Sequence, residues 1–256
     1  IPTACGGGFG GKLDLSVQPL LAIAAWKLKK PVRCTYNRIE SMASSTKRHP
    51  SKITGRYGCS QEGKLQAYEF SGIFNTGAYV SWGLTVKDRV PIHATGPYFV
   101  PNITAKSRAI FTNETPAGAF RGFGVPQAAI AHEALIDMLA EKINMDPLEF
   151  RYLNVIRKGQ ETATGQKLES AGLDQCLDAL REDWYLWRSD SEKHNLGNAI
   201  KKRGVGIGCM WYGCGNTSLA NPSTMQIGIS PKGNVTLYSG AQDIGQGTNT
   251  TMMQAA

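Results

Sequence analysis

The pattern of apolar and polar positions changes twice along the chain and divides it into three regions. Up to about residue 160, helical periodicity alternates with strand-like alternation, residues 161–202 are more polar, and short strand-like runs follow from residue 203. The pattern predicts helices over 13–30, 126–143, 147–156 and 172–195 and strands over 32–36, 52–59, 64–77, 103–113, 205–213, 225–230 and 234–240. This mixture predicts an α+β fold, with mixed sheets and packed helices.

Turn and cap residues sharpen several of these boundaries. Pro31 ends the first helix, while Pro19 either kinks that helix or marks its true first turn. Asp146 is an N-cap for the helix that follows it. Residues 61–63 form the turn of a hairpin. Three glycine clusters mark further boundaries: two lie directly before predicted helices, and the third, over 240–250, precedes a predicted helix start.

Composition supports a packed protein and excludes several classes of partner. The 256 residues are 41% hydrophobic and 19% charged, so we expect a core rather than disorder. The net charge of +8 is spread along the chain, and no nucleic-acid motif accompanies it, so no nucleic-acid partner is predicted. The six cysteines have no metal-ligand spacing, which favours reduced thiols and a cytoplasmic protein. No apolar run is long enough to predict a membrane span.

Neither end of the sequence coincides with the natural start or end of a structural element. The chain does not begin with Met and stops at TTMMQAA, without a closing element. We therefore expect it to be a fragment of a longer protein.

The first glycine cluster, CGGGFGGK over residues 5–12, fits two phosphate-binding motifs at once. A P-loop requires Ser or Thr directly after its Lys, because that hydroxyl binds magnesium, but Leu13 follows Lys12. A dinucleotide fingerprint requires an acid about 20 residues later, but no acid occurs there before Glu40. The cluster therefore fits neither the P-loop nor the dinucleotide fingerprint well. A glycine loop before a helix can still bring backbone N–H groups close to an anion or an oxo group.

Three motifs together resemble one known family. GGGFGGK over 6–12, AGAFRGFGVPQ over 117–127 and DIGQGTNT over 243–250 closely resemble the molybdenum hydroxylases, which include xanthine dehydrogenases and aldehyde oxidases. The resemblance covers nearly the whole chain and implies a molybdopterin-binding fold of the xanthine dehydrogenase/aldehyde oxidase type. It divides the chain into a first molybdopterin-binding domain over 1–160, a helical connection over 161–202 and the start of a second such domain over 203–256.

The resemblance also implies a reaction and its partners. The cofactor is molybdopterin, whose dithiolene holds the molybdenum, so no side-chain metal ligand is expected. Iron–sulfur (2Fe–2S) and FAD centres are expected on other domains or subunits, and the parent enzyme is expected to be a dimer. The expected substrate is an N-heteroaromatic, with a purine as the named candidate, hydroxylated with oxygen from water. The general-base glutamate is expected downstream, so the fragment alone should be inactive. An aldehyde-oxidising member, a non-catalytic fragment or a nucleotide-binding module are the alternatives.

The resemblance assigns a role to each motif residue. Residues expected to offer backbone N–H groups to the metal centre are Gly8, Phe9, Gly10, Phe120, Arg121 and Gly122. Phe123 is expected to pack against a flat substrate, and Arg89 is expected to orient that substrate. Gln246 and Gly247 are expected to contact the pterin or its phosphate.

Two positions depart from the purine-oxidising pattern. Leu13 stands where those members carry a substrate-binding glutamate, and no aromatic residue occurs over 214–218, where a second stacking ring is expected. The expected pocket therefore matches the purine-oxidising pattern at only some positions, so an aldehyde remains an alternative substrate. His49 and His132 are interpreted as structural residues.

Overall fold

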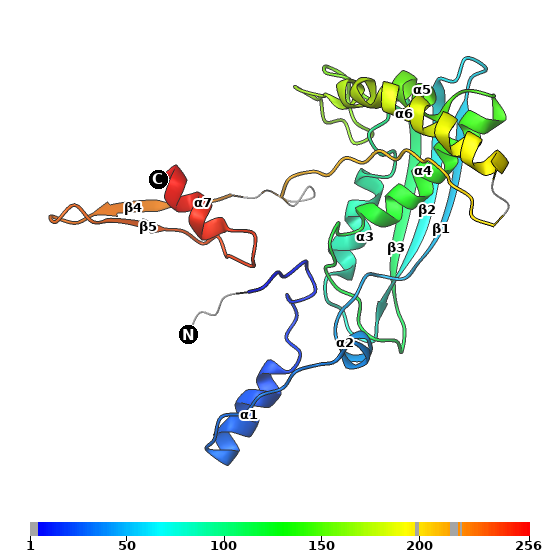
Figure 1. Cartoon of the computed structure of the whole chain (residues 1–256). Coiled ribbons are helices and arrows are strands. Elements are labelled where there is room, and N and C mark those ends of the chain that lie inside the picture. The colour runs from blue at the N-terminus through cyan, green and yellow to red at the C-terminus, as the bar shows by residue number, and fades with distance from the viewer. Residues whose placement is uncertain (1–4, 198–199, 216–219, 221) are drawn as a thin grey trace.

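A mixed three-stranded sheet forms the centre of the molecule. The computed structural model describes residues 5–197, 200–215, 220 and 222–256. Strands β1 (Ser51–Cys59), β2 (Leu65–Gly77) and β3 (Asn102–Phe111) lie in the order β1-β2-β3 (Figure 1). β1 pairs with β2 in antiparallel orientation, as the predicted hairpin requires, whereas β3 pairs with β2 in parallel orientation. The predicted α+β class is confirmed.

One face of this sheet is covered and the other is polar. In β2 the side chains of Tyr68, Phe70 and Phe74 are buried, and the exposed Glu69 and Ser71 alternate with them. Successive side chains of a strand point to opposite faces, so this alternation directs one face to the core and the other to solvent.

The covered face packs against two helices. Helix α3 (Gly83–Ile92) connects β2 to β3 and contacts both, and α4 (Val125–Lys142) packs against β1 and α3. Val90 of α3 and Ile136 of α4 are fully buried in the core. Parallel neighbours require a crossover connection, and α3 provides it.

Two further helices extend this layer. α5 (Pro147–Asn154) packs on α4, and α6 (Leu173–Gly197) packs on α5. Asp146 caps α5 as predicted, because its carboxylate accepts from the backbone N–H of Leu148 at 2.8 Å. The same carboxylate accepts from Trp184 Nε1 at 3.1 Å and from Arg188 Nη1 at 2.6 Å, so the cap also ties α6 to α5.

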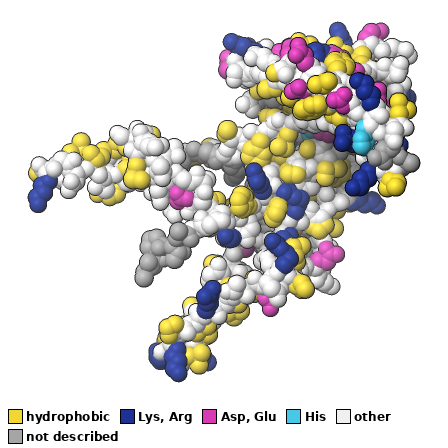
Figure 2. All heavy atoms as spheres, viewed as in Figure 1, with side chains coloured by type: hydrophobic (Ala, Val, Ile, Leu, Met, Phe, Trp, Pro, Cys, Tyr) yellow, Lys and Arg dark blue, Asp and Glu magenta, His cyan; other side chains and the backbone are white. Residues whose placement is uncertain are grey.

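The two ends of the chain project from this body. Helix α1 (Gln18–Leu28) precedes α2 (Arg38–Ser44), and a second sheet, β4 (Gln226–Ile229) and β5 (Val235–Tyr238), precedes α7 (Thr248–Ala255) (Figure 1). Neither α1 nor α7 has a buried residue, and Trp26 and Ile229 are 68% and 73% exposed. Figure 2 shows apolar side chains along both projections, with basic side chains at their tips.

Several predicted elements differ from the structure. Residues 32–36 and 205–213 are extended but form no strand. The second run is fixed by other contacts: Cys209 N donates to the Glu133 carboxylate and Gly213 N donates to His93 Nε2. The first helix begins at Gln18, so Pro19 marks its first turn.

Two helices were missed by the pattern. α2 is short and is held by a capping box between Asn37 and Glu40. α3 contains Pro91 near its end and has Gly83 at its start, so its sequence reads as a loop.

A partly buried carboxylate connects four segments of the body. Glu133 Oε2 accepts from Arg151 Nε at 3.0 Å, Arg151 Nη2 at 2.8 Å and Cys209 N at 3.1 Å, and Oε1 accepts from the Tyr98 hydroxyl at 2.6 Å. Arg151 is fully buried and also donates to Asp137 Oδ1 at 2.7 Å. Burial and the Glu133 carboxylate raise the pKa of Tyr98, so its hydroxyl remains a donor.

Replacing Arg151 should destabilise the protein strongly, because Glu133, whose side chain is mostly shielded from solvent, would lose its main partner. Arg151→Met is expected to lower the free energy of unfolding by about 3–5 kcal/mol. The matched control is Arg56→Met, which breaks the exposed Arg56–Glu69 pair and should cost under about 1 kcal/mol. Urea unfolding followed by circular dichroism measures both, and equal losses would contradict the role of the Glu133 cluster.

Three buried histidines should make stability depend on pH. Burial lowers the pKa of His49, His93 and His132 below their ordinary value near 6.5. The unfolded chain therefore binds protons that the folded chain does not, so stability should fall as the pH drops from 7 towards 5. His132→Gln removes one such site and should flatten the decline by up to about 1.4 kcal/mol per pH unit. Denaturation midpoints measured between pH 5 and 8 check this, and an unchanged slope would argue against it.

Candidate functional site

The three glycine-rich motifs meet in space, although they lie far apart in the sequence. Gly8 N donates to Ile244 O at 2.9 Å, which joins the first loop to the third. Arg121 N donates to Phe9 O at 2.9 Å, which joins the second loop to the first. The first loop is therefore the centre of the group, with one neighbour on each side.

These contacts are possible only because Cβ atoms are absent. A Cβ on Gly10, at φ +82°, would lie 1.9 Å from Ala119 O. A Cβ on Gly245, at φ +103°, would lie 2.7 Å from Gly7 N. Glycine supplies both the positive φ and the space for two backbones to touch. Gly10 and Gly245 are thus required by the packing of the loops themselves.

Two phenylalanines in these loops have a conformation that is costly for them. Phe9 and Phe123 have φ values of +51° and +47°. Non-glycine residues rarely adopt this region, at a cost of about 1–3 kcal/mol each, and such positions cluster at functional sites. Phe123 packs edge to face on Trp82 with centroids 6.0 Å apart, and the Arg121 guanidinium lies 5.6 Å from the Phe9 ring.

A hollow of about 260 Å³ opens between the first two loops. Its lining residues are Phe9, Gly10, Leu13, Trp82, Ala119, Phe120, Arg121, Gly122, Phe123 and Tyr212. The predicted residues Phe9, Leu13 and Phe123 thus share one cavity with two aromatic rings that the motifs did not indicate. Its walls can hold a flat apolar ring.

Backbone N–H groups around this hollow are free to bind a ligand. The amides of Phe9, Gly10, Phe120 and Gly122 make no hydrogen bond within the described part of the chain. The amides of Gly8 and Arg121 are already used, because they donate to Ile244 O and Phe9 O, so these two members of the predicted donor set close the loops instead. Unpaired amides on a glycine cradle fit the oxo ligands of a molybdenum cofactor.

A second hollow, of about 740 Å³, lies on the other side of Phe9 and carries positive charge. Lys12, Arg38, Lys47 and Arg121 line it together with Gly7 and Gly8. Such a cationic cavity beside open amides suits a phosphate-bearing cofactor. Burial, followed by the charge of Arg38, lowers the pKa of Lys47, whose Nζ donates to Ser41 O at 2.7 Å.

The structure places Arg89 beside the site rather than in it. The side chain is buried, and its two terminal nitrogens donate to Gly213 O and, at 2.8 Å, to Gly215 O. The guanidinium also lies 4.3 Å from the ring of Tyr212, which lines the aromatic hollow. Arg89 therefore holds the segment that carries Tyr212.

The third motif is organised by a carboxylate that sequence reasoning missed. Asp243 accepts from the amides of Gly245 at 2.9 Å, Gly247 at 3.4 Å and Asn249 at 3.2 Å. These bonds lower the pKa of Asp243. The Gln246 side chain folds over the same loop and donates to Gln242 O at 2.8 Å. The amide of Gly247 and the side chain of Gln246 thus have partners within their own loop.

Three other contributors were also missed. Trp82 lies at the start of α3, Tyr212 was placed in a predicted strand, and Arg48 stacks on Phe120 at 4.8 Å. The expected second stacking ring falls partly on residues 216–218, which lie outside the described residues. Tyr212 provides a ring a few positions earlier. An aromatic residue next to the glycines of 213 and 215 is the signal that could have found it.

The described residues contain neither a membrane-spanning helix nor a cluster of metal-binding side chains. No helix among them has the length and apolar character to cross a membrane. Nor do their His, Cys, Asp and Glu side chains gather in a group of three or more that could bind a metal ion.

Comparison with known proteins identifies the family. Residues 1–155 and 179–256 each match a family model described as a molybdopterin cofactor-binding domain. The chain is 45% identical to the nicotinate dehydrogenase large molybdopterin subunit of Eubacterium barkeri over 183 residues, covering 71% of this chain and 43% of that protein. It is 34% identical to the xanthine dehydrogenase molybdenum-binding subunit of Escherichia coli over 263 residues, covering 99% of this chain and 34% of that protein.

A solved structure agrees with the sequence matches. The aldehyde oxidoreductase from Desulfovibrio gigas superposes with a TM-score of 0.81 at 32% identity, covering 96% of this chain and 27% of that one. The chain thus spans less than half the length of these relatives. With its converging glycine loops and open amides, the chain belongs to the molybdopterin cofactor-binding domain family of the molybdenum hydroxylases.

Proposed function

We propose that the chain is part of the cofactor-binding subunit of an enzyme that hydroxylates a flat N-heteroaromatic substrate with oxygen from water. The observation that supports this most is the hollow lined by Trp82, Phe123 and Tyr212. Loop amides at its border make no hydrogen bond to any residue that the structure describes. Three aromatic rings offer stacking area with little loss of rotamer entropy. The similarity to the nicotinate dehydrogenase subunit favours the same substrate class.

The residues of the chain would act by binding and orienting. When bound, the molybdenum cofactor supplies the oxygen chemistry and accepts the electrons. The amides of Phe9, Gly10 and Gly122 would donate hydrogen bonds to its negatively charged ligands. Phe123 and Tyr212 would hold the substrate ring, while Leu13 would exclude water from its edge. The cationic hollow behind Phe9 would hold an anionic part of the cofactor.

Within this class, the structure favours a simple ring over a purine. A purine presents several polar edges, but the wall at Leu13 is apolar and both terminal nitrogens of Arg89 are bonded to backbone carbonyls. Arg89 could orient a substrate only by leaving those carbonyls, or through its buried Nε, which has no partner among the described residues. We therefore place a pyridine-type substrate such as nicotinate first and a purine second.

An aldehyde is the alternative substrate. An aldehyde needs no polar partner where Leu13 lies, and the fold superposes closely on an aldehyde oxidoreductase. The aromatic hollow accepts an aromatic aldehyde as well as a heteroaromatic ring.

The resemblance also supports proposals about the cofactors, assembly and location of the whole protein. We infer iron–sulfur and flavin centres on other domains or subunits, a dimeric assembly and a cytoplasmic location. We also keep the proposed division into domains at residues 160 and 202. The general base would lie outside these 256 residues.

The substrate proposal predicts the effect of removing an aromatic wall. In the full-length protein, Phe123→Ala should lower kcat/KM for nicotinate by about 10–100-fold, because the ring loses its stacking surface. Phe111→Ala, an exposed residue at the end of β3, is the control and should change kcat/KM less than twofold. Steady-state rates with nicotinate, hypoxanthine and benzaldehyde measure the preference. Turnover of benzaldehyde alone would favour the aldehyde alternative.

The cofactor proposal predicts that the protein binds less molybdenum when the contact between the first and second glycine loops is disrupted. Gly10→Ala should lower molybdenum and pterin content of the purified full-length protein at least about tenfold, because the new methyl group would collide with Ala119 O. Gly58→Ala on β1 meets nothing within 4 Å and should leave the content unchanged. Elemental analysis and pterin fluorescence provide the readout. A metal-free wild-type protein would defeat the proposal outright.

A further inference from the structure

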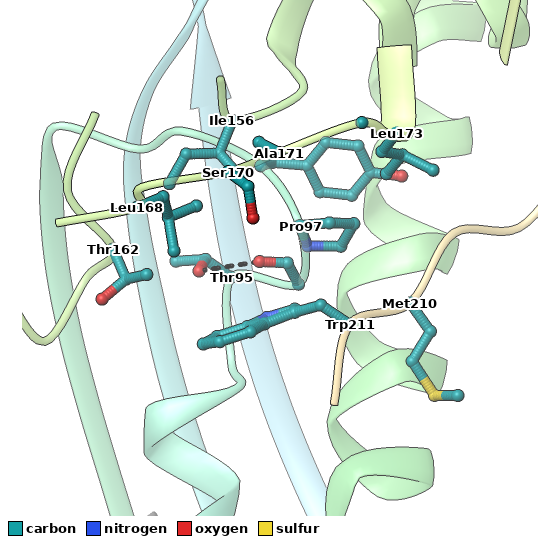
Figure 3. Close-up of a pocket in the computed structure, with 13 residues that line it drawn as sticks. Thr95, Pro97, Ile156, Thr162, Leu168, Ser170, Ala171, Leu173, Met210 and Trp211 are labelled. Atoms are coloured by element: carbon teal, nitrogen blue, oxygen red, sulfur yellow. Dashed lines mark hydrogen bonds between the residues drawn. The ribbon is translucent and has the colours of Figure 1, made fainter. Parts of the chain in front are cut away.

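The segment that carries Tyr212 into the aromatic hollow also carries Trp211 into another cavity. This cavity has a volume of about 230 Å³ and shares no lining residue with the candidate site. It lies where the 95–98 turn, the 156–173 connection and residues 210–211 meet (Figure 3). We call it the Trp211 cavity.

The Trp211 cavity has the form of a slot for a ring. Figure 3 shows the indole lying flat along one side, with Leu168 and Ser170 across from it and Pro97 beside them. The imidazole of His93 packs on Trp211, with centroids 4.6 Å apart, and fixes the indole in place. An indole held in this way offers a rigid aromatic face to a ligand.

The polar groups of the cavity are few and specific. The Ser170 hydroxyl points into the space between Leu168 and Trp211 and makes no hydrogen bond within the described residues. The Thr95 hydroxyl is already paired, because it donates to Gly96 O at 3.3 Å. The Trp211 Nε1 group is buried without a partner in the described part of the chain. One available hydroxyl among apolar walls is suited to a ligand with a single polar atom.

The size of the cavity limits the ligand. A dry cavity of about 150 Å³ accepts benzene, so a larger one of this volume accepts one or two fused rings. An elongated or highly charged molecule would leave its polar groups unpaired against Pro97, Ile156 and Leu168.

We propose that the Trp211 cavity is a second binding site for a small planar N-heteroaromatic molecule, separate from the candidate cofactor and substrate site. Its ring stacks on the Trp211 indole, and its ring nitrogen exchanges a hydrogen bond with Ser170 Oγ. Occupancy stabilises the 209–213 segment, and with it the position of Tyr212.

Calorimetric titration of the full-length protein with indole tests this site. A site with a Kd of about 0.1–1 mM is expected at the Trp211 cavity for a ligand of this size, in addition to any binding at the candidate substrate site. Ala171→Phe, which fills the cavity, should weaken binding at least tenfold, and Ser170→Ala should weaken it about threefold to tenfold through the lost hydrogen bond. Indene, which lacks the ring nitrogen, should bind both wild type and Ser170→Ala equally.

Phe123→Ala separates the Trp211 cavity from the candidate substrate site. Indole affinity in this variant should stay within twofold of wild type, whereas loss of binding would place the ligand at Phe123 and overturn the proposal. Unchanged affinity in both Ala171→Phe and Ser170→Ala would overturn it as well. Because Ala171→Phe can disturb folding, its melting temperature is measured first, and Ser170→Ala decides the question if that variant is unfolded. If indole does not bind in the Trp211 cavity, the proposed catalytic function is unaffected. That function is tested separately, by the kcat/KM of Phe123→Ala and by molybdenum content.

Discussion

The arrangement of the molecule depends on one partly buried carboxylate, whose side chain is 16% exposed. Glu133 on α4 collects donors from Tyr98, Arg151 and the backbone of Cys209, so it fixes a turn, a helix and an extended segment at one point. A buried charge is tolerated only when its hydrogen bonds are complete, and four donors satisfy this carboxylate. The extended segment continues directly to Trp211 and Tyr212. The wall of the candidate site is therefore placed by a contact in the helical layer, well away from the glycine loops.

The glycine loops depend on a different constraint: at their contact points there is no room for a side chain. Gly10 lies against Ala119 O and Gly245 against Gly7 N at distances that no Cβ could share. The loops thereby present amides and two strained phenylalanines to the same space. Strain of this kind persists only where surrounding contacts determine the conformation. Here the Trp82 ring and the Arg121 guanidinium provide those contacts, so the same groups that line the hollow also maintain its shape.

Much of this could be predicted from sequence, and the failures have physical causes. The alternation in 64–77 and the periodicity in 126–143 predicted β2 and α4, because both elements bury one face. The strand predicted over 205–213 was wrong, because its backbone bonds to Glu133 and His93 rather than to a neighbouring strand. Local pattern cannot reveal a partner more than 70 residues away. The same limit hid Tyr212, whose position depends on the distant Arg89. Asp243 was missed for a different reason: its partners are amides of its own loop, and hydrophobic periodicity does not report such local side-chain-to-backbone bonds.

Arg89 shows how a residue can influence a pocket that it does not line. Its guanidinium is planar and presents several donors, which suits two carbonyls on one turn of backbone. By holding Gly213 and Gly215 while stacking on Tyr212, it converts a glycine-rich segment into a rigid support for an aromatic wall. Glycine residues at these positions would otherwise give the segment great freedom. An arginine at this position therefore influences the width of the hollow through the position of the Tyr212 ring, although its own guanidinium does not line the hollow.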